Sequence, residues 1–374
     1  MIKFHVIQFQ KFAFLLLCVT LCPWHTVVGQ VKTINGVALS AREIDAFIVK
    51  EMESRKIPGL SLAIINDDSV VYQKGYGVKN AADNTPVDTT SLFEAASLSK
   101  PVFAYAFLKL VERGQVALDT PLYKYLENND VKYDDRYKLI TARMALSHTS
   151  GFPNWRWNNK DKRLDIKFTP GERFSYSGEG YKYLGQVMQQ LTGKDPEEVV
   201  REEVFVPLGM EHSYFRWNDT VAALTTTGHN KKYQPREKWK PDSTWVSSGL
   251  HTTAGDYARF LLAIIENDGL SEATILTMLA PQIKFEKKKM FGDSDGWGLG
   301  FGVKNTPYGV KNTHFGVNDG FQCYMEVSKE KKMALVFFTN SDAGLKIADD
   351  VIEYVVVGKE SAKQRSDRKK ISMH

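Results

Sequence analysis

The apolar pattern of this chain changes twice along its length, and this change limits the folds open to it. Six runs rich in β-branched and aromatic residues predict strands, at 60–65, 70–76, 298–303, 312–317, 322–327 and 333–339. Helical periodicity dominates between the two groups, from about 119 to 290. We therefore predict an α/β (α+β) fold with one antiparallel sheet built from both chain ends. Helices flank this sheet, and a mostly helical domain is inserted into it.

The expected helices follow from apolar residues at helical spacing and from capping residues. Ser40 precedes the first of them as an N-cap, and Thr253 with Asp256 resembles a capping box. The expected helices are 41–55, 91–112, 140–147, 181–192, 196–204, 255–267 and 344–355.

The first 29 residues differ from the rest of the chain. Lys3 and Lys11 precede an apolar run at 12–21, and small residues follow it. This order predicts a secretory signal peptide over 1–29 and a periplasmic or secreted protein. An uncleaved N-terminal membrane anchor is the alternative. The folded domain is expected over 30–357, followed by a basic, disordered tail over 358–374.

Charge and cysteine content restrict the partners. The net charge of +5 comes from the leader and the tail, so the remaining body is close to neutral. This balance predicts no nucleic-acid partner. Two of the three cysteines lie in the leader, and Cys323 alone cannot form an internal disulfide. We expect a small-molecule partner, together with an association with the cell envelope.

A Ser-x-x-Lys motif, Ser97 to Lys100, opens an apolar helical pattern. Residues three apart lie on one helix face, so the two side chains can meet in one cavity. A desolvated lysine can accept the proton of a serine hydroxyl and so activate it as a nucleophile. The motif alone is weak, because such short patterns occur by chance.

Tyr176, in the segment Phe-Ser-Tyr-Ser-Gly, is the second candidate. A cation beside a tyrosine lowers its pKa, so we expect a phenolate that serves as general base and acid. The third candidate is the run from His314 to Val317. A glycine at a strand edge, here Gly316, allows a substrate to approach and a backbone N–H to face an oxyanion.

These motifs in this order resemble the serine β-lactamase-related family, which includes class C β-lactamases, D-alanyl-D-alanine carboxypeptidases and family VIII esterases. The resemblance covers roughly 41–356. It rests on Ser97-x-x-Lys100, Leu146-Ser147-His148-Thr149-Ser150-Gly151, Pro170-Gly171-Glu172, Tyr176, Pro207-Leu208-Gly209-Met210, Ser248-Gly249-Leu250 and His314-Phe315-Gly316.

The resemblance implies a role for each of these residues. Ser97 would be the nucleophile, with Lys100 and Tyr176 as its proton-handling partners. Backbone N–H groups of Ser97 and Val317 would form the oxyanion hole. His314 would stand where the family has lysine or histidine, and no cofactor or metal is implied.

One position departs from the family pattern. The family's Tyr-x-Asn is here Tyr176-Ser177-Gly178, so the side-chain amide that orients a β-lactam or peptide amide is missing. This absence weakens the β-lactamase interpretation and places an esterase ahead of it. We expect an esterase or a D-amino-acid peptidase of the carboxypeptidase type. A β-lactamase or acyltransferase is the alternative within the family. A non-catalytic sensor or envelope scaffold is the alternative of another class.

Other signals carry less weight. The run 292–296 matches the G-x-S-x-G nucleophile motif around Ser294, but it lacks the strand before it and the helix after it that the motif needs. His148 and His251 have no second ligand at metal-binding spacing, so we expect them to shape loops. Four tryptophans are expected to line a cleft between sheet and helical domain or to pack in long loops, and they are Trp155, Trp157, Trp239 and Trp245.

Overall fold

The computed structural model describes residues 30–285 and 291–359. The expected signal peptide and nearly all of the expected basic tail lie outside these residues. Within the described ranges no helix is both long enough and apolar enough to span a membrane.

A nine-stranded antiparallel sheet forms the centre of the molecule, in the order β5-β4-β3-β13-β12-β11-β10-β9-β8. Its strands are β3 Gly59–Asn66, β4 Ser69–Asn80, β5 Thr85–Pro86, β8 Ile283–Lys284, β9 Gly296–Trp297, β10 Gly302–Thr306, β11 Gly309–Asn318, β12 Phe321–Ser328 and β13 Met333–Thr339. The N-terminal β3 pairs with the C-terminal β13, so both chain ends build the sheet as predicted. Two small ribbons accompany it, formed by β1 Val31–Lys32 with β2 Ala38–Leu39 and by β6 Phe93–Glu94 with β7 His251–Thr252.

The central strands are covered on both faces. Alternate side chains of β3 enter different cores: Leu62 and Ile64 face one, while Ala63 and Ile65 face the other. Neighbouring β13 divides its side chains in the same way. Strands buried on both faces read as continuous apolar runs, which is why both strands were predictable from sequence.

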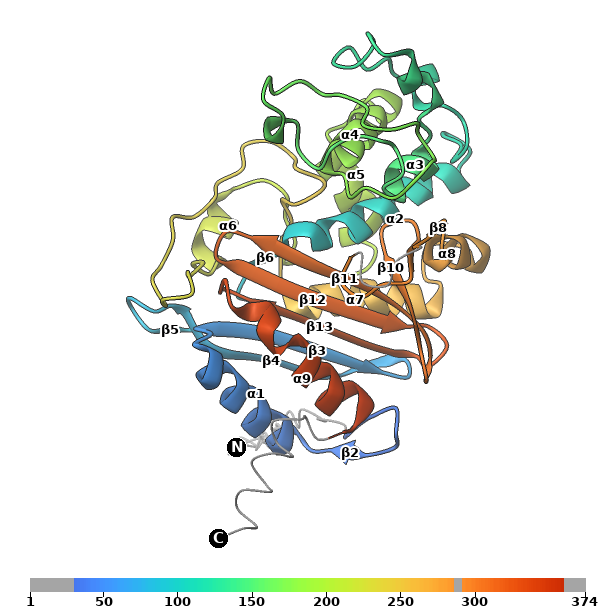
Figure 1. Cartoon of the computed structure of the whole chain (residues 1–374). Helices are drawn as coiled ribbons and strands as arrows, with labels where there is room; N and C mark the ends of the chain where they lie inside the picture. The colour runs from blue at the N-terminus through green and yellow to red at the C-terminus, as the bar shows by residue number, and fades with distance from the viewer. Residues whose placement is uncertain (1–29, 286–290, 360–374) are drawn as a thin grey trace, which may run out of the picture.

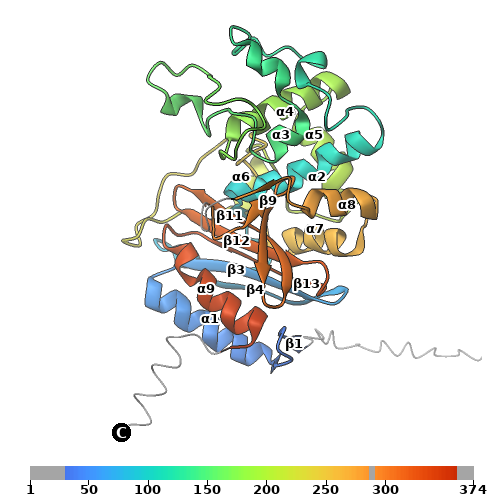
Figure 2. The same ribbon diagram turned by 45° about the vertical axis from the view of Figure 1, so that its right-hand side comes forward.

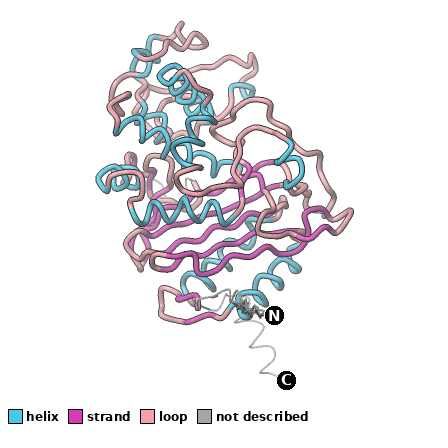
Figure 3. The backbone as a smooth tube through the Cα atoms, turned by 180° about the vertical axis from the view of Figure 1, so that it is seen from behind, coloured by secondary structure: helices cyan, strands magenta, loops and turns pink. Residues whose placement is uncertain are grey.

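Helices lie on both faces of the sheet (Figures 1 and 3). One face carries α1 Ala41–Arg55 and the C-terminal helical segment formed by η6 Gly344–Ile347, α9 Ala348–Val351 and η7 Ile352–Val357. The other face carries α2 Ser99–Glu112 and α7 Ala254–Glu266. The Ser40 and Thr253 caps form as predicted, since each side chain accepts a backbone N–H of the first helical turn.

The helical part above the sheet contains α3 Ala142–Leu146, α4 Gly178–Thr192, α5 Pro196–Val200 and the π-helical turn η5 Arg201–Phe205 (Figure 2). The remaining helices are α6 Asp219–Leu224 and α8 Glu272–Leu279, with the short 3₁₀ turns η2 Leu122–Lys124, η3 Asp135–Leu139 and η4 Arg156–Asn158. The predicted insertion over 119–290 is therefore divided, because α7 packs on the sheet and β8 is its edge strand.

One expected strand is interrupted, and one expected helix is shorter than predicted. The run 298–303 is not one strand: β9 ends at Trp297, and β10 begins at Gly302. Gly300 between them has a φ of 94°, which breaks an extended strand. The helix expected over 91–112 begins only at Ser99, because β6 and the 3₁₀ turn η1 Ala96–Leu98 precede it.

Candidate active site

Ser97 lies in η1, the tight turn between β6 and α2. The preceding Ala96 has a φ of 46°, a left-handed conformation that costs an L-residue about 1–2 kcal/mol. Ser99 holds this turn: its Oγ donates to the Ala96 carbonyl at 2.6 Å and accepts the Leu250 N–H at 3.0 Å. Ser97 itself is half-buried, so a substrate can reach its hydroxyl.

Strand β11 lies directly against this turn. A Cβ placed on Gly316 would be 2.6 Å from the Ala95 carbonyl oxygen and 2.5 Å from Cys323 Sγ. Only glycine fits there without displacing one of them. Cys323 Sγ donates to that same carbonyl at 3.1 Å, which fixes the turn to the sheet. Gly316 therefore brings the strand edge beside the nucleophile, as its sequence position predicted.

Lys100 lies in the first turn of α2 and is buried, with 1% of its surface exposed. Its Nζ lies 3.3 Å from Ser97 Oγ and 2.8 Å from the Ser247 carbonyl oxygen. Burial lowers the pKa of the ammonium to about 7, because the charged form loses its water. A large neutral fraction at neutral pH can therefore accept the Ser97 proton.

Tyr176 lies in the loop that leads into α4. Its ring centroid is 4.7 Å from Lys100 Nζ, and its hydroxyl forms a hydrogen bond with the Ser97 side chain. The expected phenolate is wrong. Burial raises the pKa of Tyr176 above its ordinary value, and the hydrogen bond to Ser97 only partly opposes this. Burial thus favours the neutral phenol form of Tyr176, and Lys100 is the better candidate for the base.

His314 points from β11 toward the same hydroxyl. Its Nδ1 donates to the Phe315 carbonyl at 2.8 Å, which leaves Nε2 as an acceptor 3.5 Å from the Tyr176 hydroxyl. Burial, with a smaller effect of Lys100, lowers the pKa of His314 to about 3. His314 is therefore neutral over the physiological range and orients Tyr176 without carrying charge.

The edge of β11 is open beside Val317. Pairing with β10 ends at Gly302 and Thr313, and in the described ranges no strand covers β11 on that side beyond this point. Val317 is 51% exposed. The next residue, Asn318, donates from Nδ2 to Glu94 Oε2 at 2.7 Å and to the Ser248 carbonyl at 3.4 Å. This contact ties the open edge to β6, so the backbone near Val317 is rigidly placed.

The structure thus brings together the predicted residues Ser97, Lys100, Tyr176 and His314, with Gly316 and Val317 beside them. The rejected G-x-S-x-G motif does not form a nucleophile turn: Ser294 is buried in the loop before β9, although it lines a pocket together with Trp297 and His314. His251 is also structural, since its ring lies in β7 with Nδ1 3.1 Å from the Gly249 carbonyl.

His148 is a part of the site that the sequence reasoning treated only as a loop residue. Its Nδ1 accepts the Ser177 N–H at 3.0 Å, and its ring lies 4.2 Å from the Tyr176 ring, centroid to centroid. Burial lowers its pKa well below the ordinary value. His148 therefore fixes the Tyr176 loop from behind. Its place in the His-Thr-Ser-Gly segment was the signal available in the sequence.

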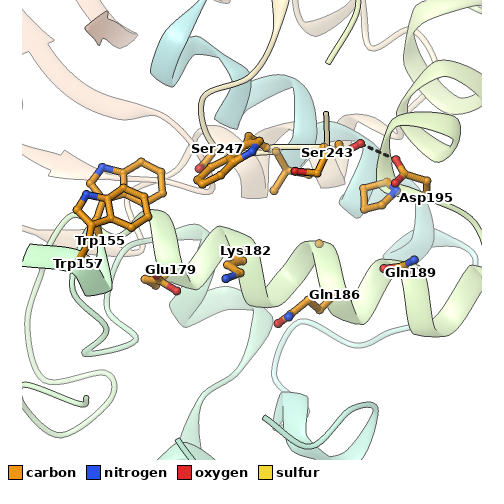
Figure 4. Close-up of a pocket in the computed structure, with 14 residues that line it drawn as sticks. Trp155, Trp157, Glu179, Lys182, Gln186, Gln189, Asp195, Ser243 and Ser247 are labelled. Carbon is orange, nitrogen blue, oxygen red and sulfur yellow. Dashed lines mark hydrogen bonds between the residues drawn. The ribbon is translucent and has the colours of Figure 1, made fainter. Parts of the chain in front are cut away.

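The missing amide at Gly178 is explained by a neighbouring indole. A Cβ on Gly178 would be 2.7 Å from Trp155 Cζ3 and 2.8 Å from Cη2. Trp155, Trp157 and Trp245 line a cleft, while Trp239 packs on Trp245 with ring centroids 6.1 Å apart. This cleft runs along α4 and not, as expected, between the sheet and the helical part (Figure 4).

Over residues 30–285 and 291–359, no three His, Cys, Asp or Glu side chains gather as a metal site. A serine, a buried lysine of lowered pKa, a phenol and an open strand edge are groups that can support nucleophilic catalysis, here on a β-lactamase-like fold. The chain belongs to the beta-lactamase family, whose pattern it matches over residues 44–357.

Curated relatives of two kinds are similar to this chain. Protein flp of Staphylococcus aureus (strain MRSA252) is 27% identical over 205 residues, which are 51% of this chain and 41% of that protein. The chain thus matches about two fifths of the flp length. Esterase EstB of Burkholderia gladioli is 25% identical over 320 residues, covering 72% of this chain and 80% of the esterase.

Two solved structures share the fold. The octameric penicillin-binding protein homologue from Pyrococcus abyssi superposes with a TM-score of 0.75 and 26% identity, over 87% of this chain and 79% of that chain. D-alanine carboxypeptidase AmpC from Burkholderia cenocepacia superposes with a TM-score of 0.69 and 19% identity, over 83% of this chain and 98% of that chain. The latter likeness shows the fold alone.

Proposed function

We propose that this protein is an esterase that cleaves carboxylic esters through an acyl-enzyme on Ser97. One observation carries the proposal: the buried Lys100 Nζ lies 3.3 Å from the Ser97 hydroxyl oxygen. Burial lowers the pKa of this lysine to about 7. A weak nucleophile becomes reactive when a base of this kind is within hydrogen-bond reach.

In the first half-reaction, Ser97 Oγ attacks the ester carbonyl carbon and its proton moves to Lys100 Nζ. The oxyanion of the tetrahedral intermediate accepts the backbone N–H groups of Ser97 and Val317. Collapse breaks the carbon–oxygen bond to the alcohol. The proton on Lys100 passes through the Tyr176 hydroxyl to the leaving alkoxide, so an alcohol departs and the acyl group stays on Ser97.

In the second half-reaction, a water molecule attacks the acyl carbonyl and gives its proton to Lys100. Collapse then breaks the bond to Ser97 Oγ, which regains a proton, and a carboxylic acid departs. His314 and His148 hold the Tyr176 phenol in place through both halves, the former through Nε2 and the latter by ring contact.

An ester is favoured over an amide for two reasons. Gly178 has no amide side chain with which to read a peptide or β-lactam amide, and Trp155 fills the space where one would stand. An alkoxide is also a better leaving group than the anion of an amine, so an ester needs less help from recognition than an amide. The similarity to esterase EstB supports this choice.

The test compares wild type with Ser97→Ala on three substrate classes: p-nitrophenyl esters, D-alanyl-D-alanine peptides and a chromogenic cephalosporin. We expect Ser97-dependent turnover of the esters and much weaker turnover of the other two, with circular dichroism showing that both proteins are folded. Faster turnover of peptide or cephalosporin would replace the esterase by the peptidase or β-lactamase alternative. No turnover of any class would favour the non-catalytic sensor or scaffold.

A further inference from the structure

A cleft of about 310 Å³ runs along α4, next to the catalytic residues. Figure 4 shows Trp155 and Trp157 at one end, the segment with Ser243 and Ser247 along one side, and α4 along the other. The two indoles are stacked, with centroids 4.7 Å apart and an interplanar angle of 9°. Trp245 closes the wall, its ring lying edge-on to both at 6.1 Å.

The tryptophan loop is fixed to α4 before any ligand arrives. Arg156 binds the Glu179 carboxylate through Nε and Nη2 at 2.8–3.1 Å, and its Nη1 reaches Asp130 at 2.6 Å. Glu179 is buried, with 2% of its surface exposed. The N–H groups of Gly178 and Glu179 donate to the Asn154 carbonyl at 3.0 and 3.2 Å. A wall held in this way loses little entropy when it binds.

The cleft shares two walls with the catalytic site. The carbonyl oxygen of Ser247 accepts a hydrogen bond from Lys100 Nζ, and Ser247 also lines the cleft. At the other wall, Trp155 lies over Gly178, two residues after Tyr176. The cleft therefore adjoins the Ser97 site through Ser247 and Trp155.

The two carboxylates that line the cleft are already engaged. Glu179 is neutralised by Arg156, and Asp195 accepts the Thr244 hydroxyl at 2.5 Å. Lys182, Gln186 and Gln189 stand on the exposed face of α4, along the rim. The inner walls are left to indole rings, which bind apolar and aromatic groups by area and by ring contact.

We propose that this cleft binds a neutral apolar or aromatic group of the ester substrate, with Trp155 as the specificity-determining residue. The inference rests on the proposed esterase function and names its substrate class: esters with a bulky apolar substituent. The indole of Trp155 takes the place of an amide-reading side chain, so the enzyme selects its substrates by apolar contact. A volume of about 310 Å³ holds an aromatic ring with a short linker.

Two ester series test this proposal. One varies the acyl group of p-nitrophenyl esters from acetyl to phenylacetyl and octanoyl, and the other varies the alcohol of acetate esters from methyl to benzyl. We expect wild type to favour the bulky member at least tenfold in kcat/KM in one of the two series. Trp155→Ala should reduce that preference to less than about threefold, while Trp155→Phe retains most of it.

The matched control is Trp217→Ala, which removes a half-buried indole outside the cleft and should leave the ratio unchanged. Because the result is a ratio within one protein, a general loss of activity cancels. Trp245→Ala provides a second cleft variant if Trp155→Ala does not fold. A wild-type preference below threefold in both series, or one that survives both cleft variants, overturns the proposal and leaves the esterase function standing.

A binding measurement separates this failure from failure of the esterase function. Benzyl acetate is titrated into Ser97→Ala protein and followed by ligand-observed NMR, which needs no turnover. We expect binding that weakens at least fivefold when Trp155→Ala is added. Binding without any esterase activity would refute the proposed function but not the cleft, and no detectable binding would refute the cleft.

Discussion

The Nζ atom of Lys100 lies 3.3 Å from the Oγ atom of Ser97. Lys100 is buried, with 1% of its surface exposed. Desolvation alone lowers the pKa of Lys100 to about 7. The second hydrogen-bond partner of Lys100 Nζ is the uncharged Ser247 carbonyl oxygen, at 2.8 Å. The pair can therefore supply a nucleophile and a base at neutral pH, as the proposed function requires.

The pH dependence of ester hydrolysis follows from this pKa. The base form of Lys100 is the neutral amine, so kcat/KM should rise with pH through about 7 and then level off. Lys100→Arg should lose at least about 100-fold, because a guanidinium does not release its proton in this range. A profile that is flat from pH 5 to 9, or an arginine variant within tenfold of wild type, would contradict the assignment.

Glu94 should make the protein less stable as the pH rises. Burial raises its pKa to about 7, whereas the unfolded chain ionises near 4.5. Between these values the native state holds more protons, so the free energy of unfolding falls as pH rises, by about 3 kcal/mol in all. Glu94→Gln keeps an acceptor for Asn318 and removes the titration. Its gain in Tm over wild type should be larger at pH 8 than at pH 5, and equal gains would contradict the account.

Because Gly178 and Trp155 lie so close together, substitutions at these two positions should have coupled effects on the free energy of unfolding. Gly178→Ala should destabilise the protein by about 1–3 kcal/mol, because the new Cβ lies 2.7 Å from the indole. In Trp155→Gly protein the same change should cost less, and the part that remains comes from the Asn154 carbonyl oxygen, 2.8 Å from the new Cβ. Gly185→Ala on the same helix is the control, since its Cβ would make only ordinary contacts from 3.4 Å. Denaturant unfolding of the four proteins of the cycle measures the coupling, and strictly additive effects would rule out the contact.

His148 should act on Tyr176 by position. His148→Ala removes the acceptor of the Ser177 N–H and the ring behind Tyr176, and we expect kcat to fall roughly 10- to 100-fold. His148→Asn, which can still accept that N–H, should recover part of the loss. The pH profile should keep its shape, because burial lowers the pKa of His148 well below its ordinary value and so favours the neutral ring. A shifted profile would instead indicate that His148 itself transfers protons.

Much of this architecture could be predicted from sequence, for definite physical reasons. Strands β3 and β13 read as unbroken apolar runs because both of their faces are buried. Ser97 and Lys100 carry their own spacing, and Gly316 marks a close backbone approach that no larger residue permits. Such features are local, so the chain displays them without its fold.

The features that were missed depend on packing between distant segments. The protonation of Tyr176 turned on the balance between burial and a nearby cation, and burial is set by surroundings such as His148 and Phe291. The place of Trp155 over Gly178 depends on the Arg156–Glu179 contact, which folds the loop back onto α4. The break at Gly300 likewise follows from its left-handed φ, which the residue type allows but does not require.

The central claim is that Ser97 carries the acyl group. Its most direct test is intact-mass spectrometry of the protein quenched in acid during turnover of a p-nitrophenyl ester, followed by peptide mapping. The account predicts an added mass equal to one acyl group, located on Ser97 and absent from Ser97→Ala protein. An acyl adduct on another residue, or one that persists in Ser97→Ala, would contradict it.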